Sequence, residues 1–372
     1  MKIKKHVCSA ILIASISSYT AQDTQDFSYT FTPRIELTET SVKSQDRTGT
    51  CWSYSASSFL ESEAARISGH VVDLSEMATV RYTYPLKAAI YIRLQGKHQF
   101  SAGSLAHDVI NAASGWGLVP QNVYTGLKDG ETVHDHDAMD KALKAAVDSI
   151  LTKPSGKIDL YWMKDVDEIL DEHIGVAPVD FVYEGETYTP ETFRDYLGID
   201  PYSYINITSF THHPFGKKFI LEIPDNFSRG EFFNVPIDEM QRVVEGALSA
   251  GYTVAWDADV SEKGFSFSHG VALLPAKGEE EKLWKEEIVE EVVTQESRQI
   301  GFENQTTTDD HLMHITGLAT DQSGNKYFII KNSWGQNNPY GGHQYISMAY
   351  FRAKTIAILV NNEAVARAFQ GK

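Results

Sequence analysis

The segment Gln45-Asp46-Arg47-Thr48-Gly49-Thr50-Cys51-Trp52-Ser53-Tyr54-Ser55 leads from a polar loop into an Ala- and Ser-rich run. Apolar residues recur at helical spacing after it, and Gly69 stands where a glycine often ends a helix. This pattern predicts one long helix over residues 51–68, with Cys51 in its first turn. The free N–H groups and the dipole at that end of a helix favour a thiolate, so Cys51 lies where a thiol nucleophile is expected.

The only other cysteine, Cys8, lies in a short apolar run that follows three lysines. This run ends in small and polar residues up to Ala21, which is typical of a secretory signal peptide. We therefore predict that residues 1–21 are removed near Ala21, and that the mature protein is secreted or periplasmic with Cys51 as its one thiol. A lone cysteine is more often a buried structural residue than a nucleophile, and this segment alone leaves that alternative open.

Two motifs in the last third of the chain favour the nucleophile. Asp310-His311-Leu312-Met313-His314-Ile315-Thr316-Gly317 is followed by Tyr327-Phe328-Ile329-Ile330-Lys331-Asn332-Ser333-Trp334-Gly335. With the Cys51 segment, and in this order, they resemble the papain superfamily of cysteine peptidases. The finer resemblance, to the bleomycin hydrolase and aminopeptidase C branch, rests on the pattern His-x-Met-x-Ile-Thr-Gly and on two further segments. These are Tyr183–Pro190 with Phe193 following, and Val254–Val260.

The resemblance runs from about Gln45 to Val360 and implies an α+β, papain-like two-lobed fold. A helical left lobe would span approximately residues 45–155. An antiparallel, β-barrel-like right lobe with large insertions would span approximately residues 156–372, with the active-site cleft between the lobes. The residue patterns predict further helices over residues 104–115, 138–151 and 279–291. Strand composition marks residues 158–162, 204–207, 219–223, 253–256 and 327–330.

The resemblance makes Cys51 the nucleophile, which needs a base within hydrogen-bond reach. His311 is our prediction for that base, and His314 is the competing candidate. In the family the catalytic histidine lies six residues before the glycine that closes its strand, which matches His311 and Gly317. Side chains alternate along a strand, so we expect only one of the two histidines to face the thiol.

Further residues receive roles from the resemblance. Asn332 would orient the imidazole through a hydrogen bond, and Trp334 would shield that bond. Gln45 would donate a side-chain N–H to the oxyanion, beside the backbone N–H of Cys51. Gly103 is a weaker match to the glycine-rich substrate wall of the family, and Trp52 is expected to pack in the cleft wall more than to bind substrate.

Other polar clusters suggest sites less strongly. His134-Asp135-His136-Asp137 has metal-binding residue types but no third ligand at a usable spacing, and His212-His213 is expected at the surface. Asp257 and Asp259 alternate along a predicted strand and are interpreted as polar residues at its end. No phosphate-binding glycine loop is present, so we predict neither a metal nor a cofactor.

The formal net charge is −17, and removal of the three lysines in the predicted signal peptide would take it to −20. Such an acidic protein is a poor partner for nucleic acid, and no later segment is long and apolar enough for membrane insertion. Peptide substrates are the expected partners. The resemblance also makes a homo-oligomer possible.

The sequence thus predicts an exported thiol peptidase that acts through a Cys51 acyl-enzyme, with an aminopeptidase of the bleomycin hydrolase type favoured over an endopeptidase. A non-catalytic peptide-binding protein on the same fold is an alternative from another class. In an aminopeptidase something must block the cleft and bind the substrate ammonium, and the carboxylate of Lys372 is one candidate. Otherwise a loop between Pro120 and Asp310 would have to form that wall.

Overall fold

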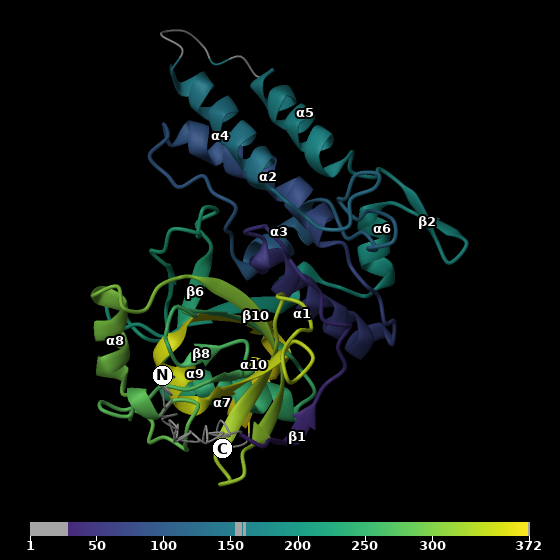
Figure 1. The fold of residues 1–372 in the computed structure, drawn as a ribbon. Coiled ribbons are helices and arrows are strands. Elements are labelled where there is room, and N and C mark those ends of the chain that lie inside the picture. The colour runs from purple at the N-terminus through teal and green to yellow at the C-terminus, as the bar shows by residue number, and fades with distance from the viewer. Residues whose placement is uncertain (1–28, 153–157, 159–160, 371–372) are drawn as a thin grey trace, which may run out of the picture.

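The computed structural model describes residues 29–152, 158 and 161–370, so the predicted signal peptide and the last two residues lie outside the described part. In Figure 1 most helices of the first half gather at the top, and a large sheet with its own helices forms the lower part. The helices of the first half are α1 (Cys51–Ser68), α2 (Glu76–Arg93), α3 (Ala106–Gly115), α4 (Asp137–Thr152), α5 (Trp162–Ile174) and α6 (Pro190–Tyr196). A small hairpin, β2 (Phe181–Tyr183) and β3 (Glu186–Tyr188), precedes α6.

Helix α1 is the central helix of the molecule. Every residue from Cys51 to Ala64 is buried, because α2 and α3 contact α1 from one side and the sheet contacts it from the other. Gly69 ends the helix with φ 77° and donates its backbone N–H to the carbonyl of Ala65, as a left-handed glycine cap does. The helix predicted over residues 51–68 is therefore confirmed.

The large sheet has the strand order β5-β6-β4-β13-β7-β10-β11-β12-β9-β8, with β1 also paired to β10. Most neighbouring strands are antiparallel, and the exceptions are the pairs β4/β6 and β9/β12. This order has two ends, so the described strands form an open sheet and not a closed barrel. The strands are β1 (Thr32–Glu36), β4 (Tyr204–Thr208), β5 (Lys218–Ile220), β6 (Glu231–Asn234), β7 (Val254–Ala258), β8 (Phe265–Ser266), β9 (Val271–Ala272), β10 (His311–Thr320), β11 (Lys326–Lys331), β12 (His343–Ser347) and β13 (Thr355–Asn361).

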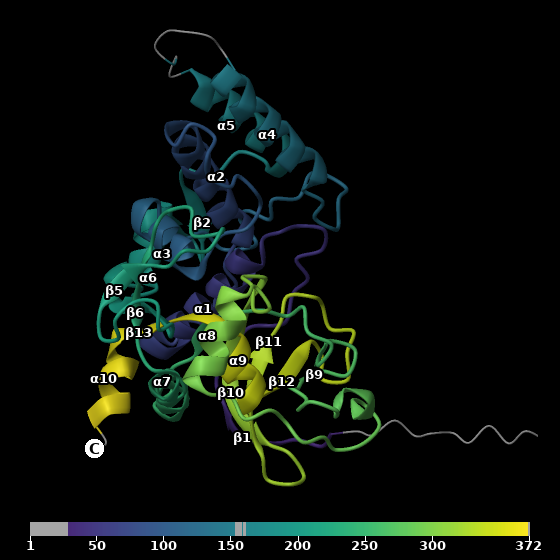
Figure 2. The ribbon, with the colours of Figure 1, turned by 90° about the vertical axis from the view of Figure 1, so that its left-hand side faces the viewer.

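The two faces of the sheet have different partners. Leu312 of β10 packs in the core that contains α1, whereas Met313 and Ile315 pack in the core with α7 (Ile237–Ser249), α9 (Met348–Lys354) and α10 (Asn362–Gln370). Figures 1 and 2 show α10 beside α7 in the lower part of the molecule. The face that carries α1 is therefore the face that positions Cys51.

The helices predicted over residues 104–115 and 138–151 are confirmed as α3 and α4, and several predicted strands are confirmed. Two predictions are wrong. Residues 159–160 of the predicted strand 158–162 lie outside the described part, and the prediction is wrong at the end of that range, because Trp162 begins α5 and Tyr161 is its N-cap. The predicted helix 279–291 is reduced to a short 3₁₀ turn, η2 (Glu280–Lys282), because Trp284 has φ 66° and Glu290 forms a bridge with Pro275 at the sheet edge.

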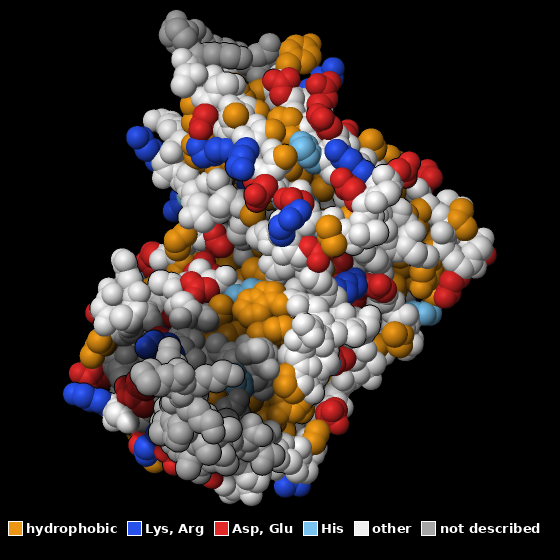
Figure 3. All heavy atoms as spheres, in the orientation of Figure 1, with side chains coloured by type: hydrophobic (Ala, Val, Ile, Leu, Met, Phe, Trp, Pro, Cys, Tyr) orange, Lys and Arg blue, Asp and Glu red, His pale blue; other side chains and the backbone are white. Residues whose placement is uncertain are grey.

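Other described elements are α8 (Gln295–Glu303) and a 3₁₀ turn, η1 (Pro201–Ser203). No helix within the described ranges combines the length and the apolar character that crossing a membrane requires. On the face shown in Figure 3, acidic and basic side chains are interspersed over the helical part.

Candidate active site

Cys51 is the first residue of α1, and its side chain is 8% exposed. The N-cap residue, Thr50, forms no side-chain hydrogen bond to the first turn of the helix. The sulfur of Cys51 lies against the backbone N–H of Leu312, the second residue of β10. The thiol therefore lies where the start of a buried helix meets the start of a strand from the second half of the chain.

His311 is the first residue of β10, and its Nε2 lies 2.8 Å from Oδ1 of Asn332, which follows β11. The Asn332 oxygen also accepts the backbone N–H of Ser333 at 2.7 Å, and the Asn332 amide donates to Gln344 at 2.7 Å. These bonds fix Oδ1 as an acceptor, so His311 donates from Nε2 and keeps its lone pair on Nδ1. The indole of Trp334 stacks on the imidazole with ring centroids 4.6 Å apart.

Gln45 is held beside this pair by the residue after Asn332. Its Oε1 accepts the hydroxyl of Ser333 at 2.7 Å, and its backbone N–H donates to the Ser333 carbonyl at 2.8 Å. One amide hydrogen of Gln45 goes to the carbonyl of Thr48 at 2.7 Å, which leaves its second hydrogen for another acceptor. Asn332 and Ser333 thus position His311 and Gln45 from adjacent points of the chain.

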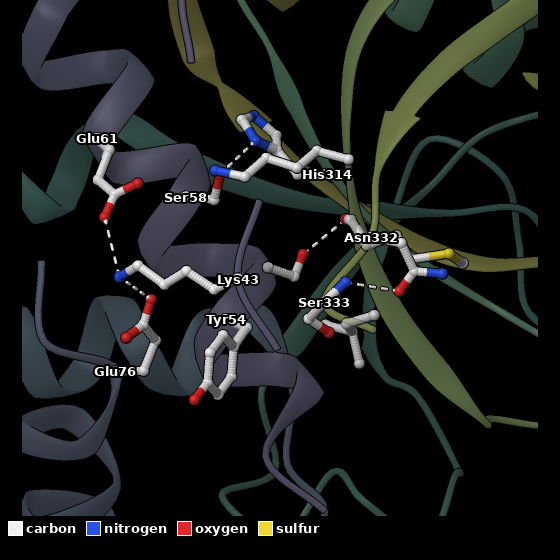
Figure 4. Close-up of a pocket in the computed structure, with 12 residues that line it drawn as sticks. Lys43, Tyr54, Ser58, Glu61, Glu76, His314, Asn332 and Ser333 are labelled. Atoms are coloured by element: carbon white, nitrogen blue, oxygen red, sulfur yellow. Dashed lines mark hydrogen bonds and ion pairs between the residues drawn. The ribbon is translucent and has the colours of Figure 1, made fainter. Parts of the chain in front are cut away.

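His314 faces a different part of the molecule (Figure 4). Its Nδ1 lies 2.9 Å from the hydroxyl of Ser58, two turns along α1 from Cys51, and the side chain is fully buried. The ammonium of Lys331 also donates to Ser58 at 2.8 Å. His314 therefore ties α1 to the sheet.

The pKa shifts of Cys51 and His311 oppose the thiolate form that the helix terminus alone would favour at Cys51. Burial raises the pKa of Cys51 to about 12, although the nearby Leu312 N–H lowers it. Burial also lowers the pKa of His311 to about 4, although the hydrogen bond that His311 donates to Asn332 raises it. Both shifts favour the neutral thiol and the neutral imidazole, and the described hydrogen bonds include none between the two side chains. Proton transfer would then accompany attack on a substrate.

The segment of the predicted substrate wall at Gly103 contacts the neighbours of Cys51 through Ala102. Trp52 is fully buried and donates its indole N–H to the carbonyl of Ala102 at 3.0 Å, so it packs the wall from behind. A Cβ on Gly49 would come within 2.6 Å of the Ala102 Cβ, which explains the glycine two residues before the thiol. A Cβ on Gly103 would come within 1.9 Å of the carboxylate of Asp225.

Sequence analysis missed a group of carboxylates near Cys51. Asp225, Asp257 and Asp309 all lie close enough to raise the pKa of its thiol. Asp257 had been interpreted as a polar residue at a strand end, but it is only 3% exposed and lies opposite Leu312 in the β7/β10 pairing. The sequence signal that could have indicated this role was a charged residue, Asp257, within the otherwise apolar segment Val254–Ala258. The proximity of Asp225 and Asp309 to Cys51 depends on tertiary packing.

Two clusters in the described ranges bring three metal-ligand atoms within 4.8 Å of one another. The first, Glu61, Asp73 and Glu76, already surrounds the ammonium of Lys43. In the second, His212, His213 and Glu222, the His212 Nδ1 accepts an N–H from Gln299, so Nε2 carries the proton that points to Glu222. The predicted cluster at residues 134–137 does not form such a group, because Asp135 pairs with Arg47.

Comparison with known proteins agrees with this geometry. Residues 115–371, which include His311 and Asn332, match the Peptidase C1-like family. The chain belongs to that family. A search of the curated proteins finds no relative. The papain-like cysteine peptidase fold predicted from the sequence is thereby confirmed.

Two solved structures are similar to this Peptidase C1-like chain. PepW from Lactobacillus rhamnosis superposes with a TM-score of 0.71 at 17% identity, over 91% of this chain and 85% of PepW. The bromelain protease from Ananas comosus, solved with the inhibitor E64, gives a TM-score of 0.41 at 14% identity, over 87% of this chain and 93% of bromelain. The likeness to PepW is one of fold across nearly the whole described chain.

Proposed function

We propose that this protein is a thiol aminopeptidase of the bleomycin hydrolase type that hydrolyses peptides through an acyl-enzyme on Cys51. The observation that carries the thiol peptidase chemistry is that the Asn332 oxygen accepts hydrogen bonds from both His311 and the backbone N–H of Ser333. Because His311 must donate from Nε2, its lone pair is on Nδ1. Membership of the Peptidase C1-like family supports the same class. Gln45 completes the set that the chemistry requires.

In the proposed mechanism His311 Nδ1 removes the thiol proton as the sulfur of Cys51 attacks the carbonyl carbon. The oxyanion would be stabilised by the free amide hydrogen of Gln45 and the backbone N–H of Cys51. The protonated His311 then donates to the leaving amine, and a water molecule, deprotonated by His311, releases the acyl group and restores the thiol. Burial of Cys51 and His311 strengthens each of these interactions, since water does not compete with them.

The aminopeptidase specificity is supported by a loop and not by the C-terminus. Helix α10 leads the chain along α7, where Ala368 contacts Gly246 on the face of the sheet away from Cys51. The terminal carboxylate of Lys372 lies outside the described residues. The loop of residues 221–230, between β5 and β6, instead brings Asp225 against Gly103, as a wall formed by the insertion requires.

The decisive test of the thiol chemistry is hydrolysis of coumarin amides by the wild type and by Cys51→Ala. We expect release of the fluorophore by the wild type, and complete loss with an unchanged circular dichroism spectrum in Cys51→Ala. Hydrolysis that persists in Cys51→Ala would overturn the assignment. A wild type that binds peptides but cleaves none would instead favour the non-catalytic peptide-binding alternative.

A second comparison separates an aminopeptidase from an endopeptidase. The substrates are alanyl-coumarin amide with a free amine and the same amide with an acetylated amine. We expect the free-amine substrate to be preferred, whereas an endopeptidase would accept or prefer the blocked one. We also propose export, with cleavage near Ala21, on the basis of the N-terminal sequence. N-terminal sequencing of the protein recovered outside the cytoplasm would begin at Gln22 if this is correct.

A further inference from the structure

Lys87 of α2 is a buried cation whose partners are not carboxylates. Its side chain is 3% exposed, and it forms no ion pair with an Asp or Glu of the described residues. The carboxylates whose charges act on it, Asp225, Asp108 and Asp140, each accept a hydrogen bond from another side chain. Burying an ammonium without a paired carboxylate is costly, so the groups that Lys87 does bind are of interest.

The ammonium of Lys87 binds the backbone at the predicted substrate wall. It donates to the carbonyl of Ser101 at 2.6 Å and to the carbonyl of Gly103. The carbonyl between them, that of Ala102, accepts the indole N–H of Trp52 at 3.0 Å. Ser101, Ala102 and Gly103 are here called the wall segment. All three of its carbonyls are therefore held by buried side chains of α1 and α2.

The wall segment has no regular structure that would hold it otherwise. It lies between α2 and α3, and none of its residues belongs to a helix or a strand. Within the described part of the chain, no backbone–backbone hydrogen bond involves any of its three residues. The side chains of Lys87 and Trp52 are thus the donors that fix this stretch of backbone.

The wall segment contacts residues on both sides of Cys51. Trp52 follows the thiol in the chain, and a Cβ on Gly49, two residues before the thiol, would come within 2.6 Å of the Ala102 Cβ. The wall segment itself is half-buried, so part of its surface is accessible to a ligand. A displacement of the wall segment would therefore change the shape of the surface beside the thiol.

Lys87 also joins the wall segment to the loop of residues 221–230. Its ammonium lies 5.2 Å from the centroid of the Phe227 ring, within the range of a cation–π contact. The same loop brings the carboxylate of Asp225 against Gly103. The ammonium thus lies where the wall segment meets the loop that is proposed to limit the cleft.

We propose that Lys87 is a positioning residue for peptide hydrolysis, which holds the wall segment in the place where substrate binds beside Cys51. An apolar side chain would fill the same space without burying a charge, but it would leave the carbonyls of Ser101 and Gly103 without their donor. A lysine has three N–H groups on a long stem, which allows one side chain to bind both carbonyls. This inference rests on the proposed function and adds a residue that lies outside the motifs recognised in the sequence.

The experiment compares steady-state kinetics of the wild type, Lys87→Met and Lys87→Gln on whichever of the two coumarin amides is cleaved faster. Lys87→Met loses every donor, so we expect KM to rise about 10-fold, while kcat stays within about three-fold because the reacting groups keep their contacts. Lys87→Gln retains two N–H groups and should raise KM less. Lys97→Met removes an exposed lysine just before the wall segment and is the matched control, with both parameters unchanged.

A pH profile separates positioning from simple packing. Burial lowers the pKa of Lys87 to about 8, although the charges of Asp225, Asp108 and Asp140 act in the opposite direction. Above this pH the neutral amine donates weaker hydrogen bonds, because they are no longer charge-assisted. The KM of Lys87→Met divided by that of the wild type should therefore fall between pH 6.5 and pH 9.5. Titration of the substrate amine is common to both proteins and cancels in this ratio.

The outcomes separate this inference from the proposed function. A folded Lys87→Met variant with an unchanged KM, or with a loss confined to kcat, would overturn the positioning role even if the wild type cleaves peptides. If Lys87→Met does not fold, the KM ratio of Lys87→Gln to the wild type replaces it, and a ratio that is independent of pH would overturn the role.

A measurement of binding covers the case of a wild type without hydrolysis, which would refute the proposed function. Calorimetry with Ala-Ala-Ala in a Cys51→Ala background compares Lys87 with Lys87→Met in the absence of turnover. We expect binding to weaken about 10-fold in the double variant. Equal affinities would overturn the role of Lys87, whereas weaker binding by a protein that cleaves nothing would leave a peptide-binding site that Lys87 positions.

Discussion

Two groups of buried carboxylates lie against α1 and β10, and they differ in their partners. Glu61 and Glu76 surround the ammonium of Lys43 (Figure 4), and Glu61 also accepts the backbone N–H of Leu74 at 2.7 Å. Asp225, Asp257 and Asp309, whose charges act on the Cys51 thiol, form no ion pair with a Lys or Arg of the described residues. Burial alone therefore does not define a site. The balanced group is held by a cation, whereas Asp257 and Asp309 are held by a hydrogen bond between their own carboxyl groups.

The balanced group stabilises the contact between α1, α2 and the loop before α1. Lys43 forms salt bridges of 2.6 Å to Glu76 and 4.0 Å to Glu61, whose side chains are at most 3% exposed. Burial still raises the pKa of Glu61 to about 7, and Lys43 acts against this shift. The ammonium of Lys43 is thus required to offset the cost of burying the Glu61 and Glu76 carboxylates close together.

The largest predicted effect concerns the two histidines of β10. His311 belongs to the candidate active site, whereas His314 lies on the side of the balanced group. His311→Ala removes the base and should lower kcat by about two to four powers of ten. His314→Ala should leave kcat within a few-fold of the wild type, because its partner Ser58 lies away from the thiol, but should lower the unfolding midpoint. Kinetics of both variants on one coumarin amide, with urea denaturation, provide the measurement. A His314→Ala variant without turnover would mean that the wrong histidine has been assigned.

The next effect is on stability. Lys43→Met leaves Glu61 and Glu76 buried without their cation, which typically costs about 3–5 kcal/mol for a buried pair. Asp257→Asn should cost far less, because no cation is lost and the amide can still donate to the Asp309 carboxyl. Urea unfolding of both variants at neutral pH tests the difference. The contrast fails if the two free energies of unfolding fall by the same amount.

The sequence predicted much of the site but not its carboxylate group. Cys51, His311 and Asn332 lie in segments whose residue order could be recognised, because the chemistry constrains the local pattern. Asp225 and Asp309 lie in segments that look like ordinary polar loops. Their role depends on how the loop at residues 221–230 reaches Gly103, and this packing leaves no periodic signal in the sequence.

Some elements of the fold were missed for a related reason. Helix α2 was not predicted, since its buried residues include Glu76, Thr79 and Lys87 and surround it on several sides. Such a helix shows no apolar stripe with a period of 3.6 residues. Ser75, which caps α2 by accepting the N–H of Ala78 at 3.0 Å, was the one local signal.

A smaller effect should appear in the alkylation of Cys51. Burial is the main reason that the pKa of the Cys51 thiol is raised, and the negative charges of Asp225, Asp257 and Asp309 raise it further. The same negative charge should slow iodoacetate relative to neutral iodoacetamide by several-fold at low salt. Asp225→Asn should raise the iodoacetate rate more than the iodoacetamide rate and shift the alkylation profile to lower pH. Rates followed by mass spectrometry would reveal the change, and an unaltered ratio would place the charge too far from the sulfur.

The smallest predicted effect is the pH dependence of stability due to Asp309. Burial, with Asp225 and Asp310 as nearby negative charges, raises the pKa of its carboxyl to about 7, although a contact with Asp257 acts in the opposite direction. A carboxyl whose pKa is raised on folding contributes stability that is present below its unfolded pKa of about 4 and is lost as the pH rises through 7. Asp309→Asn does not titrate, so its urea midpoint should exceed that of the wild type at pH 8 and match it near pH 4. The balanced group cannot produce this difference, because Lys43 remains in both proteins. A variant that is less stable than the wild type at pH 8 would contradict the raised pKa, because it would show that the ionised Asp309 carboxylate stabilises the fold.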